Sequence, residues 1–135
     1  MSCLIFLKKN DIIYIRVEGV SKMANRWYLY LDDERSINAK YEPYIWSCYV
    51  HGLSTILIVR DYNAMVNTLE EARENNIEVI LDLDHDLGPG LNGYDVCKYL
   101  ISTDYTPCKF HLHTMNPVGR FNMRQLLKHH GYEEF

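Results

Sequence analysis

Residues 77–96 read IEVILDLDHDLGPGLNGYDV, and this stretch decides the fold of the chain. The apolar beginning is typical of a buried strand, predicted over 77–84, and the glycines and proline of GPGLNG (88–93) predict a loop. Three aspartates and a histidine lie at the end of this strand and directly after it, at positions 82, 84, 86 and 85. Carboxylates so close together repel one another, so their concentration at the end of a strand needs a physical reason.

The same alternation of apolar runs and helical patterns continues on both sides of this stretch. It predicts strands at 26–32, 54–60, 77–84 and 107–114, helices at 42–52, 62–76 (capped by Asp61) and 94–103, and a loop followed by a final helix within 116–130. Short apolar strands that alternate with helices form a parallel sheet covered on both faces. The sequence therefore predicts a three-layer α/β/α domain with a parallel sheet of four to five strands.

The N-terminal segment has a different pattern. CLIFL and DIIYIRVEG predict two strands joined by KKN, so residues 1–22 are interpreted as a β-hairpin extension of a domain that spans 23–135. The exposed edge of this hairpin could support a homodimer. The run CLIFL is too short for a signal peptide or a membrane span, and none of the four cysteines forms a CxxC pair. We therefore expect a cytoplasmic protein without a membrane partner.

The composition bounds the function. The 135 residues are 47% hydrophobic and 24% charged, which is typical of one globular domain, and the formal net charge of -4 argues against general DNA binding. Ligands of an open parallel sheet bind beyond the carboxyl ends of its strands. Asp32 and Asp33 follow one predicted strand, and Asp84 and Asp86 follow another. We expect a divalent metal ion, Mg²⁺ or Mn²⁺, to neutralise these four acids; the alternative is that they cap helices and solvate loops.

Three of the motifs, LYLDDER (29–35), VILDLDHDLGPGLNGYDV (79–96) and FHLHT (110–114), together resemble the receiver domain of response regulators. The resemblance implies a flavodoxin-like fold, a metal-binding pair at Asp32 and Asp33, a phosphate-accepting position at Asp84 and a switch hydroxyl at Thr114. Asp82 competes with Asp84 for that position, but the apolar run reaches Leu83 and favours Asp84. The chain departs from receivers because no lysine follows a fifth strand.

The motifs LDDER, LDHDLG, GYDV and NPVGR, which lie between residues 27 and 128, are similar to a less familiar offshoot, the cyclic-phosphate-processing receiver-like domains of bacteria and their phages. This resemblance implies a phosphate-containing ligand, either an RNA 2′,3′-cyclic end or a cyclic nucleotide. The residue types agree with that chemistry. His85 and His113 are candidates for proton transfer beside Asp84, and Arg120 and Asn116 could bind phosphate oxygens together with Thr114.

Three functions fit these residues. The first is a metal-dependent phosphoesterase that hydrolyses a cyclic phosphate. The second is a phosphoacceptor signalling module that uses Asp84, against which the missing lysine argues. The third is a non-catalytic module that binds or sequesters a nucleotide or a protein partner. The sequence favours the first function and leaves open whether the domain is an enzyme.

Overall fold

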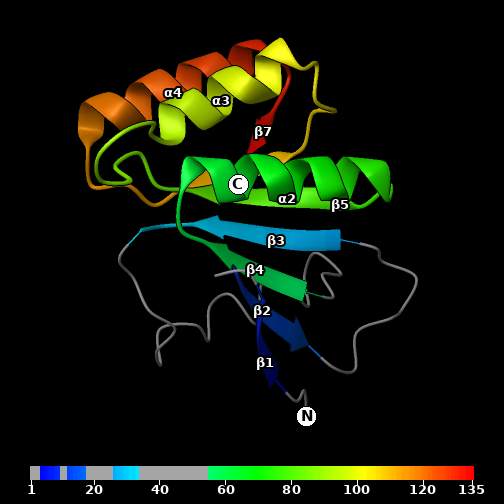
Figure 1. Ribbon diagram of the computed structural model, residues 1–135. Coiled ribbons are helices and arrows are strands. Elements are labelled where there is room, and N and C mark those ends of the chain that lie inside the picture. Colours follow the sequence, from blue (N-terminus) through cyan, green and yellow to red (C-terminus); the bar gives the residue numbers. More distant parts are fainter. Residues whose placement is uncertain (1–3, 10–11, 18–25, 34–54) are drawn as a thin grey trace.

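The fold is a single seven-stranded sheet with helices packed against it (Figure 1). The computed structural model describes residues 4–9, 12–17, 26–33 and 55–135. The strands are β1 (Leu4–Lys9), β2 (Ile12–Val17), β3 (Arg26–Leu31), β4 (Thr55–Val59), β5 (Glu78–Leu83), β6 (Lys109–Leu112) and β7 (Glu133–Glu134). The helices are α2 (Tyr62–Glu74), α3 (Gly93–Ser102) and α4 (Pro117–His129). The sheet order is β1-β2-β4-β3-β5-β6-β7.

Five of these strands form the parallel sheet that the sequence predicts. β4, β3, β5, β6 and β7 are parallel neighbours in that order. Counted along the chain from β3, this order is 2-1-3-4-5, which is the flavodoxin-like arrangement. The fifth strand is the short β7, whose two residues pair with the beginning of β6. The receiver-like α/β fold is therefore confirmed, with five parallel strands rather than four.

The two N-terminal strands extend the sheet beyond β4. β1 and β2 pair antiparallel, and β2 pairs antiparallel with β4, so they lie at the end of the sheet opposite β7 (Figure 1). Residues 10–11, which join the two strands, lie outside the described residues. The division of the chain at residue 22 stays a prediction.

Each helix begins at the carboxyl edge of the parallel strands with a side-chain cap. Asp61 accepts a hydrogen bond from the Ala64 N–H (2.8 Å), as predicted. Asn92 and Asp95 form a capping box at the start of α3, and the hydrogen bond from the Asn92 N–H lowers the pKa of Asp95. Asn116 caps α4 by accepting from the Gly119 N–H (2.9 Å). The caps fix where each strand-to-helix connection turns.

Alternation along the strands sends side chains to two faces. Leucines and valines of the central strands pack with the inner sides of α2, α3 and α4 in one core. On the opposite face the side chains of Tyr28, Tyr30 and Asp82 are also buried. The helix predicted over 42–52 lies outside the described residues, so the second helical layer stays a prediction. Among the helices that the structure describes, none has the length and apolar character needed to cross a bilayer.

Candidate functional site

The polar site lies where β3, β5 and β6 end. The backbone ladder continues beyond the strands through three hydrogen bonds: Asp32 N–H to Val59 O (3.0 Å), Asp84 N–H to Leu31 O (3.0 Å) and His113 N–H to Leu83 O (3.1 Å). Because these bonds hold the backbone on each strand, the side chains of Asp32, Asp84 and His113 converge at one edge of the sheet.

These three side chains form the candidate metal group. One ligand atom from each of Asp32, Asp84 and His113 lies within 4.8 Å of the others. Asp32 is only 2% exposed, so its carboxylate is removed from most of the water that would screen it. Two carboxylates and an imidazole suit a divalent ion such as Mn²⁺, Zn²⁺ or Fe²⁺ better than a site made of oxygen ligands alone. The donor set therefore fits a divalent metal ion.

The imidazole ring of His113 is contacted at both of its nitrogens and on one of its faces. Its Nδ1 lies 2.5 Å from Oδ1 of Asp82, and its Nε2 lies 3.1 Å from Oδ2 of Asp32. The Tyr30 ring stacks on the imidazole, with ring centres 4.5 Å apart and an interplanar angle of 6°. The Tyr28 hydroxyl donates a hydrogen bond to the other carboxylate oxygen of Asp82. The orientation of the imidazole is thus fixed by residues of β5 and of β3 with its carboxyl end.

The sequence interpretation considered Asp82 only as an alternative to Asp84 for the phosphate-accepting position, and it assigned no site role to Tyr28 or Tyr30. Asp82 is fully buried, although it lies among apolar residues of β5. One signal could have found it: residues two apart on a strand point to the same face, so Asp82 and Asp84 share a side of the sheet. Its contact with His113 depends on the pairing of β5 with β6.

His85 lies beside the metal group, at the start of the loop that follows β5. Its Nδ1 is 3.0 Å from Oδ1 of Asp86 and 3.4 Å from Nδ2 of Asn116, and its backbone N–H donates to Oδ1 of Asp84 (2.8 Å). The Asp86 side chain is 67% exposed. The structure therefore places His85 and Asp86 next to Asp84 but outside the metal group.

Two glycines allow the first turns of α3 and α4 to approach Asp84 and His85 closely. A Cβ at Gly93 would lie 1.9 Å from the carbonyl oxygen of Asp84, and a Cβ at Gly119 would lie 2.5 Å from the ring of His85. A third glycine, Gly88, has a φ of +77°, and a Cβ there would lie 3.5 Å from Oδ2 of Asp33. Asp33 thus faces the loop, and it too lies outside the metal group.

The residues predicted to bind phosphate meet at the start of α4. The Thr114 side chain is buried, and its Oγ1 accepts from the Asn116 N–H (3.1 Å). The guanidinium of Arg120 donates to the Thr114 carbonyl oxygen. The Nε of Arg120 is buried and has no hydrogen-bond partner in the part of the chain that the structure describes. A buried donor without an acceptor is costly, and a ligand oxygen would satisfy it.

The family profile of the cyclic-phosphate processing receiver domain matches residues 27–129. The chain belongs to this family. The resemblance drawn from the four motifs is therefore confirmed, and the match spans the ends of β3, β5 and β6 where the polar site lies. No curated protein and no solved structure matches the chain significantly.

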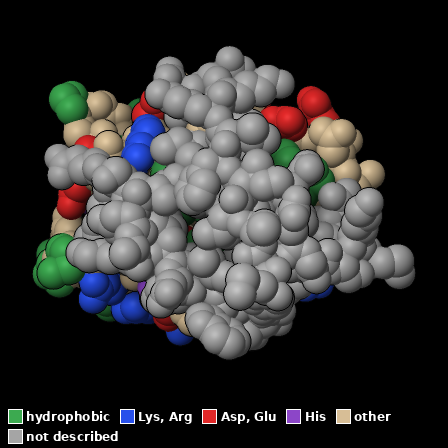
Figure 2. Space-filling view, turned by 90° about the horizontal axis from the view of Figure 1, so that it is seen from below, with side chains coloured by type: hydrophobic (Ala, Val, Ile, Leu, Met, Phe, Trp, Pro, Cys, Tyr) green, Lys and Arg blue, Asp and Glu red, His purple; other side chains and the backbone are tan. Residues whose placement is uncertain are grey.

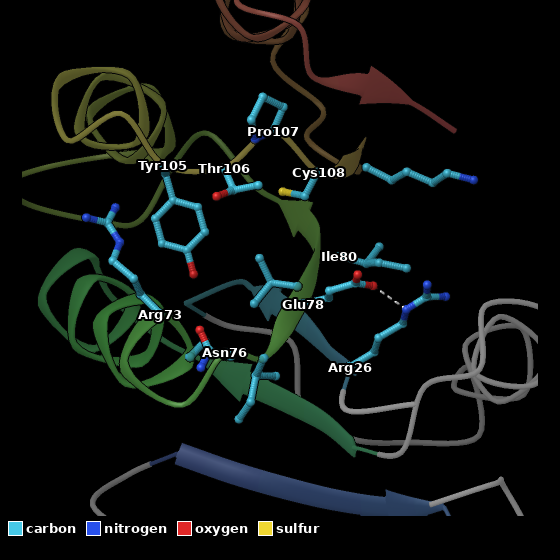
Figure 3. Close-up of a pocket in the computed structure, with 13 residues that line it drawn as sticks. Arg26, Arg73, Asn76, Glu78, Ile80, Tyr105, Thr106, Pro107 and Cys108 are labelled. Carbon is cyan, nitrogen blue, oxygen red and sulfur yellow. Dashed lines mark hydrogen bonds and ion pairs between the residues drawn. The ribbon is translucent and has the colours of Figure 1, made fainter. Parts of the chain in front are cut away.

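A cavity in the described part of this receiver domain lies away from the polar site. This cavity of about 530 Å³ opens at the amino ends of β3, β5 and β6 (Figure 3). Two of its cations have partners: Arg26 pairs with Glu78 (2.5 Å), and Arg73 lies 4.6 Å from the centre of the Tyr105 ring. Burial raises the pKa of both Tyr105 and Cys108 to about 12, so neither ionises near neutral pH. None of the residues predicted from the sequence to bind metal or phosphate lines this cavity.

Charges of both signs are also mixed on the outside of the receiver domain. In the view from below, Lys and Arg side chains appear beside Asp and Glu side chains at the margin of the molecule (Figure 2). This mixture differs from the concentrated acids of the polar site.

Proposed function

We propose that this receiver domain is a metal-dependent phosphoesterase that processes a cyclic phosphate, either an RNA 2′,3′-cyclic end or a cyclic nucleotide. The observation that carries the proposal is the convergence of Asp32, Asp84 and His113 within 4.8 Å at the edge of the sheet where ligands bind. The family match supports the same substrate chemistry, because the family is described as processing cyclic phosphates.

Asp32, Asp84 and His113 would hold the metal ion, with Mn²⁺ or Mg²⁺ as the first candidates. When bound, such an ion neutralises charge on phosphate oxygens and makes a water molecule more acidic. Asp33 and Asp86 remain predicted ligands that the observed group does not include. Asp33 follows Asp32 directly and Asp86 lies two residues after Asp84, so both would orient the loop around the metal ion.

Proton transfer is assigned first to His85. Hydrolysis of a cyclic phosphodiester adds water to phosphorus and breaks one ester P–O bond, and the departing oxygen takes up a proton. His85 is half-buried beside Asp84, and Asp86 and Asn116 orient its ring. His113 is less suited to this role because both of its nitrogens face carboxylates.

Arg120, Thr114 and Asn116 would bind the phosphate oxygens, and the unpaired Nε of Arg120 is the donor available for them. Exposed apolar side chains flank these residues. Met115 and Phe121 lie immediately beside Asn116 and Arg120 in the chain, and both are more than half exposed. They offer a surface for the nucleoside part of the substrate, since a base stacks on exposed aromatic and apolar groups.

The test is turnover of nucleoside 2′,3′- and 3′,5′-cyclic phosphates by the full chain with Mn²⁺. Asp84→Asn should lower turnover by about a thousandfold, because several kcal/mol of charge stabilisation is lost. The matched control is Asp61→Asn, which removes a carboxylate from the same edge and keeps a good helix cap. Turnover that survives Asp84→Asn would contradict the proposal.

The same preparation separates the alternatives. Tight binding of a cyclic nucleotide without turnover would indicate a sequestering module. A mass gain of one phosphoryl group after incubation with a small phosphodonor, lost in Asp84→Asn, would indicate a phosphoacceptor.

A further inference from the structure

We propose that Asp82 is the positioning residue of the metal site. It keeps the imidazole proton of His113 on Nδ1, so that the lone pair of Nε2 faces Asp32 and Asp84. This inference rests on the proposed function, because it concerns how the same site binds its metal ion. Asp82 itself lies outside the group of candidate ligands.

The first argument is the hydrogen bonding of Asp82. Its side chain is 0% exposed, and its two oxygens have separate partners, His113 Nδ1 at 2.5 Å and the Tyr28 hydroxyl. A carboxylate only accepts hydrogen bonds, so a ring nitrogen at this distance is the donor. Because water does not reach Asp82, no solvent molecule competes for the His113 nitrogen. The buried contact therefore selects one tautomer.

The second argument is the position of the other ring nitrogen. A neutral imidazole carries one N–H, so a proton held on Nδ1 leaves a lone pair on Nε2. That nitrogen lies 3.1 Å from Oδ2 of Asp32 and belongs to the group that includes Asp84. When this nitrogen carries no proton, it and the carboxylate oxygen can share one cation, which both then bind. A metal-binding histidine usually binds the metal through one ring nitrogen and donates the N–H of the other to a carboxylate.

The third argument is the rigidity of the assembly. Tyr28 comes from β3, Asp82 from β5 and His113 follows β6, so three paired strands set the distances. The Tyr30 ring, also from β3, packs flat on the imidazole. With its face and both nitrogens in contact, the ring cannot rotate without breaking several contacts. A site prepared in this way loses little entropy when a ligand binds.

The experiment compares the full chain with Asp82→Asn. Asparagine has the same size, but its amide can donate to Nδ1 and so favours the wrong tautomer. Both proteins are titrated with Mn²⁺, and the free ion is measured by its electron paramagnetic resonance signal. The dissociation constant of Asp82→Asn for Mn²⁺ should be about 10- to 100-fold higher than that of the wild type. The ¹⁵N shifts of the His113 ring in the Zn²⁺-saturated protein should show a proton on Nδ1 in the wild type and a loss of that state in Asp82→Asn.

Two further variants keep the result interpretable. Tyr132→Phe removes another buried hydroxyl hydrogen bond, to the Tyr105 carbonyl at 2.8 Å, and should lower stability without changing Mn²⁺ affinity. Tyr28→Phe removes the outer hydrogen bond of Asp82 and should weaken Mn²⁺ binding by a smaller factor. If Asp82→Asn does not fold, Tyr28→Phe decides, and an unchanged Mn²⁺ affinity in it overturns the inference.

The outcomes separate this inference from the proposed function. Equal Mn²⁺ affinity and an unchanged tautomer in folded Asp82→Asn would overturn the positioning role and leave the metal site standing. A wild-type chain that binds no Mn²⁺ would overturn the metal site and the inference together. An equal loss of affinity in Tyr132→Phe would show that the effect is a general loss of stability, which also overturns the inference.

Discussion

The two ends of the same parallel strands differ in how they carry charge. At the carboxyl edge Asp32, Asp82 and Asp84 surround one imidazole, and the first two are almost fully buried. At the amino edge the charges are exposed and paired with opposite charges, as in the ion pair between Arg26 and Glu78. One edge concentrates like charges, whereas the other distributes unlike ones.

This difference separates function from stability. Exposed ion pairs contribute at most about 1 kcal/mol each, and their loss changes little. Buried carboxylates that face one another oppose folding until something neutralises them. The carboxyl edge is therefore held by the rest of the fold in an arrangement that it would not adopt alone, which is typical of a binding site. Four predictions test the comparison.

The largest effect is expected for Gly93→Ala at the carboxyl edge. The added carbon would lie 1.9 Å from the carbonyl oxygen of Asp84, and both groups belong to backbone that cannot swing aside. We expect the free energy of unfolding, measured with urea, to fall by about 3 kcal/mol, with weaker Mn²⁺ binding. Gly90→Ala is the control, since no atom lies within 4 Å and only its φ of +98° is strained. Equal losses for the two variants would contradict the steric argument.

The second prediction concerns the repulsion itself. Mn²⁺ at a hundred times its dissociation constant should stabilise the wild type by about 2.7 kcal/mol. In chelator, Asp84→Asn should be more stable than the wild type by about 1 kcal/mol, because one of the facing charges is gone. Thermal unfolding with and without Mn²⁺ measures both changes. A variant that is less stable in chelator would show that the acids do not oppose folding.

A smaller effect is expected for Glu134, which ties β7 to α4. Partial burial raises its pKa, but hydrogen bonds from Arg124 and Lys128 outweigh this, and the pKa ends below its usual value. A lowered pKa in the folded state means that the stabilisation is present at neutral pH and is lost as the pH falls. Glu134→Gln should therefore be less stable by up to about 1 kcal/mol at pH 7, and the difference should diminish as the pH falls below about 4.

Constant stability of Glu134→Gln relative to the wild type between pH 7 and pH 3 would contradict this account. Urea unfolding at several pH values gives the comparison directly.

The smallest effect is expected at the amino edge. Glu78→Gln breaks the pair with Arg26, whose side chain is 43% exposed, and should change the free energy of unfolding by less than about 0.5 kcal/mol. Mn²⁺ affinity should not change. A loss larger than that of Glu134→Gln would remove the contrast between the two edges.

The order of elements could be predicted because each has a local signal. Asp61 caps α2 as expected, the apolar run of β5 ends at Leu83, and the last helix begins directly after Asn116. These features depend on residues a few positions apart. The acids at the strand ends were found for the same reason, since an apolar run that stops at an aspartate is visible in one line of sequence.

The role of Asp82 could not be predicted in this way. Its partners, Tyr28 and His113, lie 54 and 31 positions away, and their contact depends on the register of two strand pairs. A sequence pattern does not specify that register. The sequence therefore presents Asp82 as an alternative to Asp84 for the phosphate-accepting position, whereas in the structure Asp82 contacts His113.

The distance along the chain between the members of this cluster also bears on how the protein folds. Asp32 and His113 meet although 81 positions separate them, and Asp82 joins them from a third strand. Contacts between such distant segments form late, because the entropy of closing long loops must be lost first. No early or partial intermediate assembles the cluster before β6 has joined β5 beside β3. The appearance of high-affinity metal binding during refolding would then report the completion of the sheet.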